Sequence, residues 1–160
     1  MPRAAGERDA LEEWLDFHRE TLLWKCAGLT EDQLRLRSVA PSTMSLLGLV
    51  RHMAEVERGW FRISVAGEPE VYLYGSEDSL DADFDDVDTA DAEADFEVFE
   101  REVAAARAAV SGRSLDDTFL SRRGKTLDVR WVYLHMIAEY ARHNGHADLL
   151  REAIDGTTGA

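Results

Sequence analysis

The sequence predicts an all-α protein, folded as a bundle of four long helices. Only 3 of the 160 residues are proline and 11 are glycine, so few residues interrupt a helix. Between these breaks, apolar side chains recur every three or four residues, which places them on one helix face. A chain of this length fits one compact core, and we expect residues 1–160 to form a single domain.

The first helix is predicted from about Glu7 to Ala27, with an apolar stripe along one side. Gly28 follows it, at the position where a helix C-terminus favours glycine. The next residues, Thr30–Gln33, have the pattern of a capping box that opens a short helical turn. Residues Val39–Ser42 are then typical of a loop.

The second long helix is predicted from about Ser45 to Val65, and Gly67–Pro69 ends it. Its apolar residues recur at helical spacing, and His52 lies on the face that they form. We therefore expect the imidazole of His52 to point into the bundle.

An acidic segment follows, since residues 77–102 hold thirteen Asp and Glu side chains and one Arg. We interpret this segment as a solvated face of the molecule. Within it, Asp88 or Thr89 is expected to cap a third helix that runs to Val110, with Gly112 behind its end. The acidic residues occupy the N-terminal half of this helix, where the helix dipole favours negative charge.

Residues 117–126 predict a short connection, with a small hairpin around Arg123 and Gly124. The fourth helix is predicted from about Asp128 to Ile154, and Gly156 closes it.

Charge and cysteine content exclude several classes of function. The net charge of −14 repels nucleic acids and anionic membrane surfaces, so neither is an expected partner. No apolar run approaches the roughly 20 residues of a membrane-spanning helix, and we expect a cytoplasmic protein. Cys26 is the single cysteine, which excludes a disulfide within the chain and a zinc site built on several thiolates. Any metal site must use histidine and carboxylate ligands.

Four polar residues lie on one side of the fourth helix. At about 100° per residue, their side chains project in similar directions; they are His135, Glu139, His143 and His146. Imidazole and carboxylate groups on the apolar side of a helix cost desolvation free energy unless something satisfies them. A metal ion would do so, and a buried hydrogen-bond network is the alternative.

Glu139 and His143 lie one helical turn apart and can share one cation. His52 is the other histidine centred on a core-facing stripe, so the predicted metal ligands are His52, Glu139 and His143. Two imidazoles with one carboxylate suit Zn²⁺, with Ni²⁺ and Fe²⁺ as alternatives. Three protein ligands leave coordination positions open for water or substrate.

Two long segments resemble the DinB-like four-helix-bundle metalloproteins, and more closely their branch grouped with mycothiol-dependent transferases. These segments are SLLGLVRHMAEVERGWF at residues 45–61 and RWVYLHMIAEYARHNGHADLLRE at residues 130–152. The resemblance extends over nearly the whole chain. It implies an up-down-down-up bundle, often dimeric, whose second helix supplies one ligand to a divalent metal and whose last helix supplies two.

Carried onto this sequence, those ligands fall on His52, Glu139 and His143, which periodicity also selects. Many DinB-like proteins have histidine at the position of Glu139, whereas the mycothiol-dependent maleylpyruvate isomerases, which this chain resembles, have glutamate there. Those isomerases carry an additional C-terminal domain, for which 160 residues leave no room. The resemblance therefore favours a small thiol transferase over that isomerisation.

In such a transferase, the metal would bind a low-molecular-weight thiol, mycothiol or bacillithiol, whose thiolate attacks a small-molecule electrophile. Two alternatives use the same three ligands. One is a metal-dependent hydrolase that activates water, and the other is a non-enzymatic metal-binding stress-response protein. The resemblance also leads us to expect a homodimer.

Further residues are assigned to the surroundings of the metal. His146 is expected to support the ligands, and His135 either does the same or is a hydrogen-bonded core histidine. The walls of the pocket are expected from Trp60, Phe61 and Trp131. A substrate carboxylate is expected to meet Arg51, Arg58 or Arg142. His18 is expected to be a packing or hydrogen-bonding residue, and Cys26 is expected to serve packing.

Overall fold

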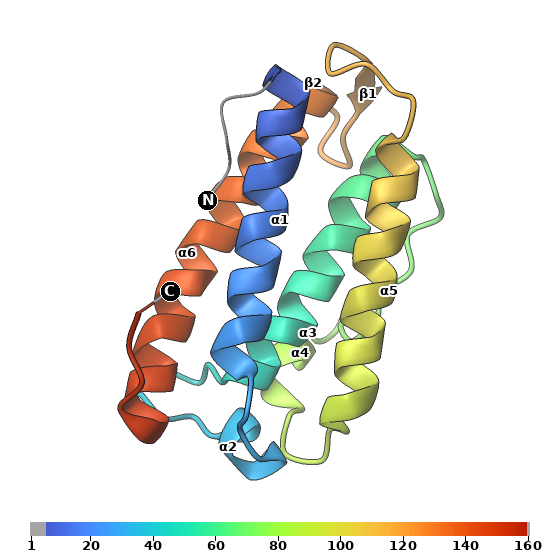
Figure 1. Cartoon of the computed structure of the whole chain (residues 1–160). Helices are drawn as coiled ribbons and strands as arrows, with labels where there is room; N and C mark the ends of the chain where they lie inside the picture. Colours follow the sequence, from blue (N-terminus) through green and yellow to red (C-terminus); the bar gives the residue numbers. More distant parts are fainter. Residues whose placement is uncertain (1–5, 160) are drawn as a thin grey trace.

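The computed structural model describes residues 6–159, in which four long helical segments lie side by side (Figure 1). They are α1 (Glu7–Cys26), α3 (Leu46–Glu57) with its continuation η1 (Arg58–Val65), α5 (Ala92–Val110) and α6 (Val129–Asp155). The helices α1 and α6 run in one direction, and α3 and α5 run in the other. The all-α bundle with up-down-down-up order is therefore confirmed. The domain expected over residues 1–160 includes residues 1–5 and 160, which lie outside the described range.

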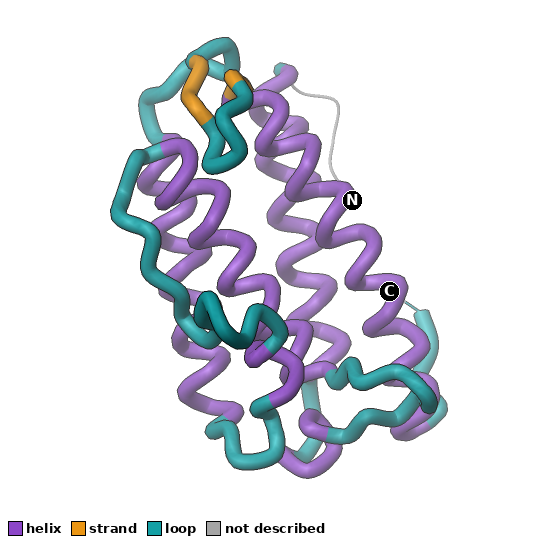
Figure 2. The backbone as a smooth tube through the Cα atoms, turned by 180° about the vertical axis from the view of Figure 1, so that it is seen from behind, coloured by secondary structure: helices purple, strands orange, loops and turns teal. Residues whose placement is uncertain are grey.

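Short elements occupy the two ends of the bundle. They are α2 (Glu31–Arg35) and α4 (Ala82–Asp85) at one end, and β1 (Thr118–Leu120) with β2 (Thr126–Asp128) at the other. The two strands form an antiparallel hairpin in which Phe119 pairs with Leu127. A long crossover joins η1 to α5 and returns the chain along the back of the bundle (Figure 2).

The ends of the helices follow the signals in the sequence. Thr30 and Gln33 form both hydrogen bonds of the capping box, and Asp128 caps α6 by accepting from the backbone N–H of Trp131. Gly28 and Gly156 have φ of 76°, the left-handed conformation that favours glycine after a helix. The predicted bounds of the first and fourth helices differ from the observed ones by one residue at most.

Two details differ from the expected elements. The third helix begins at Ala92 with Asp91 as its cap, instead of Asp88 or Thr89, because Asp91 accepts from the backbone N–H of Ala94. The second helix changes to π geometry over its last eight residues, Arg58–Val65, and the N–H of Ala66 donates to the carbonyl of Phe61.

The core lies between two helix pairs, since α1 packs chiefly against α6 and α3 packs chiefly against α5. Its apolar side chains enclose an ionic network around Glu57. The guanidinium of Arg19 donates to both carboxylate oxygens of Glu57 at 2.7 Å, and the hydroxyl of Tyr140 donates to the same carboxylate at 2.8 Å. The network therefore ties α1, α3 and α6 together. Among residues 6–159, no helix is long and apolar enough to cross a membrane.

The interpretation of residues 77–102 as a solvated face is wrong for three of its acidic side chains. Asp83, Asp95 and Glu102 are buried, at 4%, 6% and 3% exposure. Each has a partner on α3 or η1: His52 for Asp83, Arg51 for Asp95, and both Arg58 and Arg62 for Glu102. These pairs attach the crossover and α5 to the second helix.

Candidate metal centre

The three predicted ligands come together between α3 and α6. Each of His52, Glu139 and His143 offers a ligand atom, and these atoms all lie within 4.8 Å of one another. Glu139 Oε1 lies 3.4 Å from His143 Nε2 and 3.8 Å from His52 Nε2. The side chains are largely buried, with 23% of His52, 19% of Glu139 and 12% of His143 exposed.

Local helix geometry explains this arrangement. Ser45 caps α3 by accepting from the N–H of Gly48, which places His52 in the second turn of that helix. Buried neighbours such as Leu49 and Met53 fix the rotation of α3 against the core. Glu139 and His143 are separated by four residues on α6 and therefore lie on the same side of it.

The donor atoms fit a divalent metal. His52 Nε2 is buried and has no hydrogen-bond partner among the described residues, although a buried polar atom normally has one. The other ring nitrogen, Nδ1, lies 2.8 Å from Asp83 Oδ2. A carboxylate that holds the far nitrogen of an imidazole is a common support for a metal-binding histidine. Two imidazole nitrogens and a carboxylate oxygen are the donors of many zinc sites.

Burial also keeps His143 in the form that binds metals. Desolvation lowers the pKa of His143 to about 4, and repulsion from His52 and His146 acts in the same direction, whereas Glu139 opposes it. At neutral pH the imidazole is therefore uncharged, with a lone pair available for a cation. His146 Nδ1 lies 3.3 Å from His143 Nδ1, so His146 contacts a predicted ligand from the adjacent turn.

An aromatic cluster lies one helical turn before Glu139. The rings of Trp131 and His135 are stacked with centroids 4.8 Å apart and an angle of 9° between planes. The ring of Trp60 packs against both, at 5.1 Å from Trp131 and 4.7 Å from His135. Burial lowers the pKa of His135, which is thus a neutral aromatic surface at pH 7.

Several residues assigned to the pocket lie elsewhere or are already paired. Phe61 is buried in the core, where it packs against Tyr133. Arg51 donates to the backbone oxygens of Ala82 and Asp83 and to Asp95, and Arg58 donates to Val71 O and to Glu102. These contacts engage three of the five N–H donors of Arg51 and two of those of Arg58, and only 9% and 13% of the two side chains are exposed, so both guanidinium groups are already held by acceptors within the protein. Arg142 is 70% exposed and lies 4.0 Å from Glu139 Oε2, so it is the basic residue of the three that reaches the candidate site.

His18 and Cys26 lie apart from the three ligands. The ring of His18 packs against Trp14 and Phe17, and the side chain of Asn144 donates to its carbonyl oxygen. Cys26 is 4% exposed, and burial raises the pKa of its thiol to about 12. Neither residue contributes a donor to the cluster.

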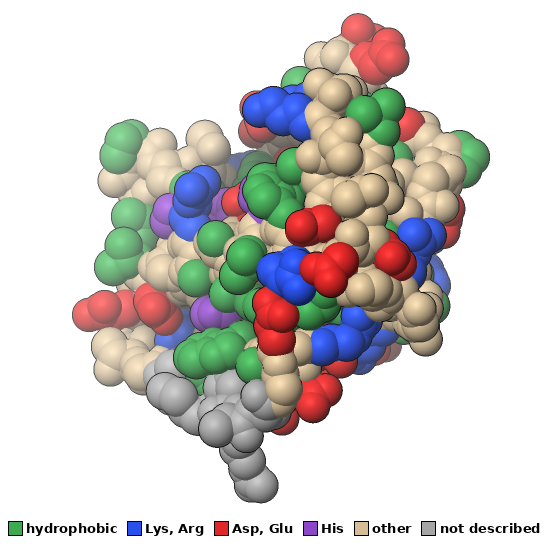
Figure 3. Space-filling view, turned by 90° about the horizontal axis from the view of Figure 1, so that it is seen from above, with side chains coloured by type: hydrophobic (Ala, Val, Ile, Leu, Met, Phe, Trp, Pro, Cys, Tyr) green, Lys and Arg blue, Asp and Glu red, His purple; other side chains and the backbone are tan. Residues whose placement is uncertain are grey.

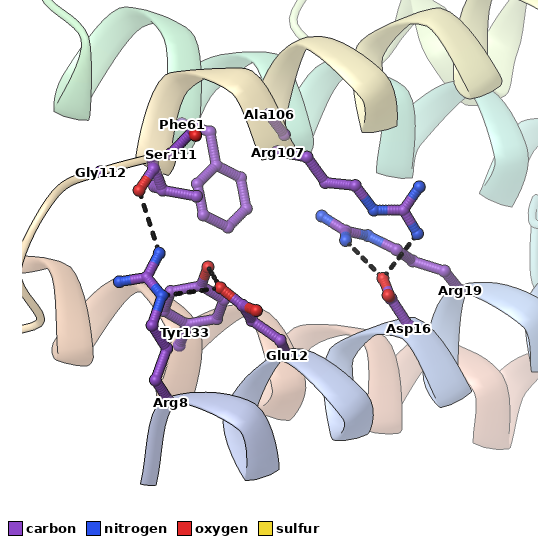
Figure 4. Close-up of a pocket in the computed structure, with 11 residues that line it drawn as sticks. Arg8, Glu12, Asp16, Arg19, Phe61, Ala106, Arg107, Ser111, Gly112 and Tyr133 are labelled. Carbon is purple, nitrogen blue, oxygen red and sulfur yellow. Dashed lines mark hydrogen bonds and ion pairs between the residues drawn. The ribbon is translucent and has the colours of Figure 1, made fainter. Parts of the chain in front are cut away.

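A cavity of about 320 Å³ opens between α1 and α5, away from these ligands (Figure 4). Charged side chains line it in pairs: Arg8 with Glu12 at one end, and Asp16 with Arg19 and Arg107 at the other. Since every guanidinium in this cavity already has an acidic partner, the cavity offers no unpaired charge to a ligand. The candidate chemistry therefore remains at the cluster between α3 and α6.

Asp83 is the residue of the site that the sequence analysis did not identify. It belongs to α4, in the acidic segment interpreted as solvated, and periodicity carries no signal for a contact made across the bundle.

Comparison with known proteins gives both a family and a fold. Residues 10–156 match the family described as mycothiol S-transferase. The crystal structure of the mycothiol-dependent maleylpyruvate isomerase superposes with a TM-score of 0.58 at 17% identity, covering 84% of this chain and 59% of the isomerase. A mutant of that isomerase, with one histidine replaced by alanine, gives a TM-score of 0.58 at 16% identity, covering 92% and 62%. This chain thus spans about three fifths of the isomerase length, and no curated protein matches it.

Proposed function

The chain belongs to the mycothiol S-transferase family, a branch of the DinB-like four-helix bundles, and we propose that it is a zinc-dependent transferase with mycothiol as its nucleophile. The observation that carries this proposal is the cluster of His52, Glu139 and His143, in which the buried His52 Nε2 has no hydrogen-bond partner among the described residues. Bound zinc supplies a Lewis acid that binds the sulfur of a thiol and lowers its pKa, so that the thiolate forms at neutral pH.

The protein side chains have three tasks in this proposal. His52, Glu139 and His143 hold the metal from two helices, and the packing of α3 against the core keeps the three donors in place. The cluster of Trp60, Trp131 and His135 offers an apolar wall beside Glu139, which excludes water and accepts the electrophile. Arg142 offers an exposed charge near Glu139, suited to a carboxylate on either substrate.

The first test is the metal content of untagged protein, measured by mass spectrometry on the native chain and on His52→Ala. We expect about one equivalent of zinc in the native protein and none in the variant. His18→Ala is the matched control, because His18 is a half-buried histidine outside the cluster. Protein that holds no divalent metal, even after reconstitution, contradicts the proposal.

The second test is turnover with a panel of electrophiles, with mycothiol, bacillithiol or no added thiol. We expect conjugates only with mycothiol and only in the zinc-loaded protein. Faster conjugation of bacillithiol would overturn the choice of thiol. Hydrolysis of ester or amide substrates without thiol would instead assign the same ligands to a hydrolase. The homodimer and the cytoplasmic location stay predictions.

A further inference from the structure

We infer that Asp83 is a positioning residue of the candidate site, which fixes the proton of His52 on Nδ1 and thereby directs the Nε2 lone pair at Glu139 and His143. A carboxylate has only acceptor oxygens, so in the 2.8 Å contact between His52 Nδ1 and Asp83 Oδ2 the imidazole is the donor. A neutral imidazole carries one proton, and Nε2 is then left with its lone pair.

The orientation of the Asp83 carboxylate is itself fixed. Its Oδ1 accepts from the backbone N–H of Phe84 at 2.9 Å, which turns Oδ2 toward His52. The ring of Phe84 packs against the imidazole, with centroids 5.0 Å apart and an angle of 31° between planes. Asp83 is only 4% exposed, so water does not compete for its oxygens.

Arg51 holds the short helix α4, and with it Asp83, in place against α3. Arg51, the neighbour of His52 on α3, donates to Asp83 O at 2.9 Å and to Ala82 O at 3.2 Å. It also pairs with Asp95 at the start of α5, at 3.2 Å, and its guanidinium lies 4.1 Å from the centre of the Tyr74 ring. The guanidinium thus fastens α4 to α3 beside the histidine that Asp83 contacts.

The isosteric variant Asp83→Asn separates this role from a packing role. The N–H of Phe84 requires an oxygen at the Oδ1 position, so the amide NH₂ of Asn takes the Oδ2 position and donates to His52 Nδ1. We expect the imidazole proton to move to Nε2 in this variant, although the shape of the side chain is unchanged. Asp85→Asn is the matched control, because Asp85 is an exposed acidic residue of the same short helix.

The first measurement is the tautomer of His52 in metal-free protein at pH 8, by long-range ¹H–¹⁵N correlation NMR. We expect Nδ1–H in the native chain and in Asp85→Asn, and Nε2–H in Asp83→Asn. The same tautomer in all three proteins overturns the inference. This measurement needs no metal, so it tests Asp83 even if the proposed function fails.

The second measurement is the zinc dissociation constant, by competition with a chromophoric chelator; this part rests on the proposed function. We expect Asp83→Asn to bind zinc about 10–100-fold more weakly than the native chain, since a contact to a ligand's far nitrogen has an effect of that size. Equal affinities for the native chain and Asp83→Asn overturn the inference. Native protein that binds no zinc refutes the proposed function instead. Asp83→Ala removes the acceptor, and we expect its zinc dissociation constant to lie between those of the native chain and of Asp83→Asn.

Discussion

Cys26 is the single cysteine of the chain, and its buried thiol does not take part in the thiol chemistry proposed for the site. Burial raises its pKa to about 12, and the side chain is 4% exposed. Because the thiolate is the reactive form, we expect no labelling of native protein by iodoacetamide at pH 8, and complete labelling in concentrated urea. Mass spectrometry gives the extent of labelling at one site. Labelling at equal rates in both conditions would contradict the burial of Cys26.

Glu57 is fully buried and holds two partners, so its removal has a large cost in stability. In Glu57→Ala, the buried guanidinium of Arg19 loses both of its hydrogen bonds to Glu57 and keeps the one to Asp16, and the hydroxyl of Tyr140 loses its acceptor. We expect the free energy of unfolding to fall by about 3–5 kcal/mol, the usual cost of removing one member of a buried ion pair. Urea denaturation measures this change. Glu68→Ala is the control, since Glu68 pairs with Arg62 near the surface and should cost about 1 kcal/mol or less. If both variants lost a similar free energy of unfolding, the buried network would contribute no more to stability than a surface ion pair.

At the scale of the helices, the sequence predicted those features that depend on neighbouring residues. Helix ends were predictable at Gly28 and Gly156, and helix starts at Thr30 and Asp128. Each of these residues interacts with backbone groups only three or four residues away, so the local sequence carries the signal. Glu139 and His143 were found for the same reason, since their spacing on one helix fixes their relation. The prediction of His52 as the third ligand also required the assumption that the apolar faces of the second and fourth helices meet in the core.

Features that depend on contacts across the bundle could not be read in the same way. The helix α4 has only four residues, and Arg51 holds it by donating to its backbone oxygens. Hydrophobic periodicity in the sequence carries no information on such contacts. Asp83 and Asp95 are acidic residues in an acidic segment, and only their partners on α3 distinguish them from solvated neighbours. The π geometry of η1 likewise has no local signal in the sequence.

Gly48 permits the close packing of α4 on α3. A Cβ atom at this position would lie 2.8 Å from Phe84 Cδ1 and 3.4 Å from Phe84 Cα. Overpacking costs about 1–3 kcal/mol, which exceeds the gain of roughly 1 kcal/mol that alanine brings to a helix interior. We therefore expect Gly48→Ala to lower the midpoint of urea unfolding and, by displacing Phe84 and Asp83, to weaken zinc binding. A more stable variant with native zinc affinity would contradict this account of Gly48.

Gly145 is the opposite case on α6. It lies within the helix at an exposed position, and a Cβ atom there would meet nothing within 4 Å. We expect Gly145→Ala to raise the free energy of unfolding by about 0.5–1 kcal/mol, because alanine loses less backbone entropy than glycine in a helix. The same urea titration checks the sign. A decrease would mean that α6 needs flexibility beside His143 and His146.

At the scale of the whole molecule, the net charge of −14 is accompanied by many ion pairs. At the hairpin end, acidic and basic side chains are interspersed on the surface (Figure 3). Arg130 there pairs with Glu7 and Asp116, which links the start of α6 to α1 and to the loop before the hairpin. Burial of acidic side chains against arginine, as for Glu57 and Glu102, removes part of the repulsion that such a charge would otherwise impose on a compact fold.

The candidate ligands come from helices that are far apart in the sequence, so metal binding and folding must be coupled. His52 on α3 and His143 on α6 meet only when the bundle is formed, and a metal that needs both binds the folded chain alone. At a free zinc concentration of about 100 times the dissociation constant, this linkage adds about 2.7 kcal/mol to stability. For a chain of this size we expect the midpoint of thermal unfolding to rise by roughly 5–10 °C, measured by circular dichroism with zinc and with a chelator. The rise should disappear in His143→Ala and persist in His18→Ala. An equal rise in His143→Ala would mean that zinc stabilises the fold from another site.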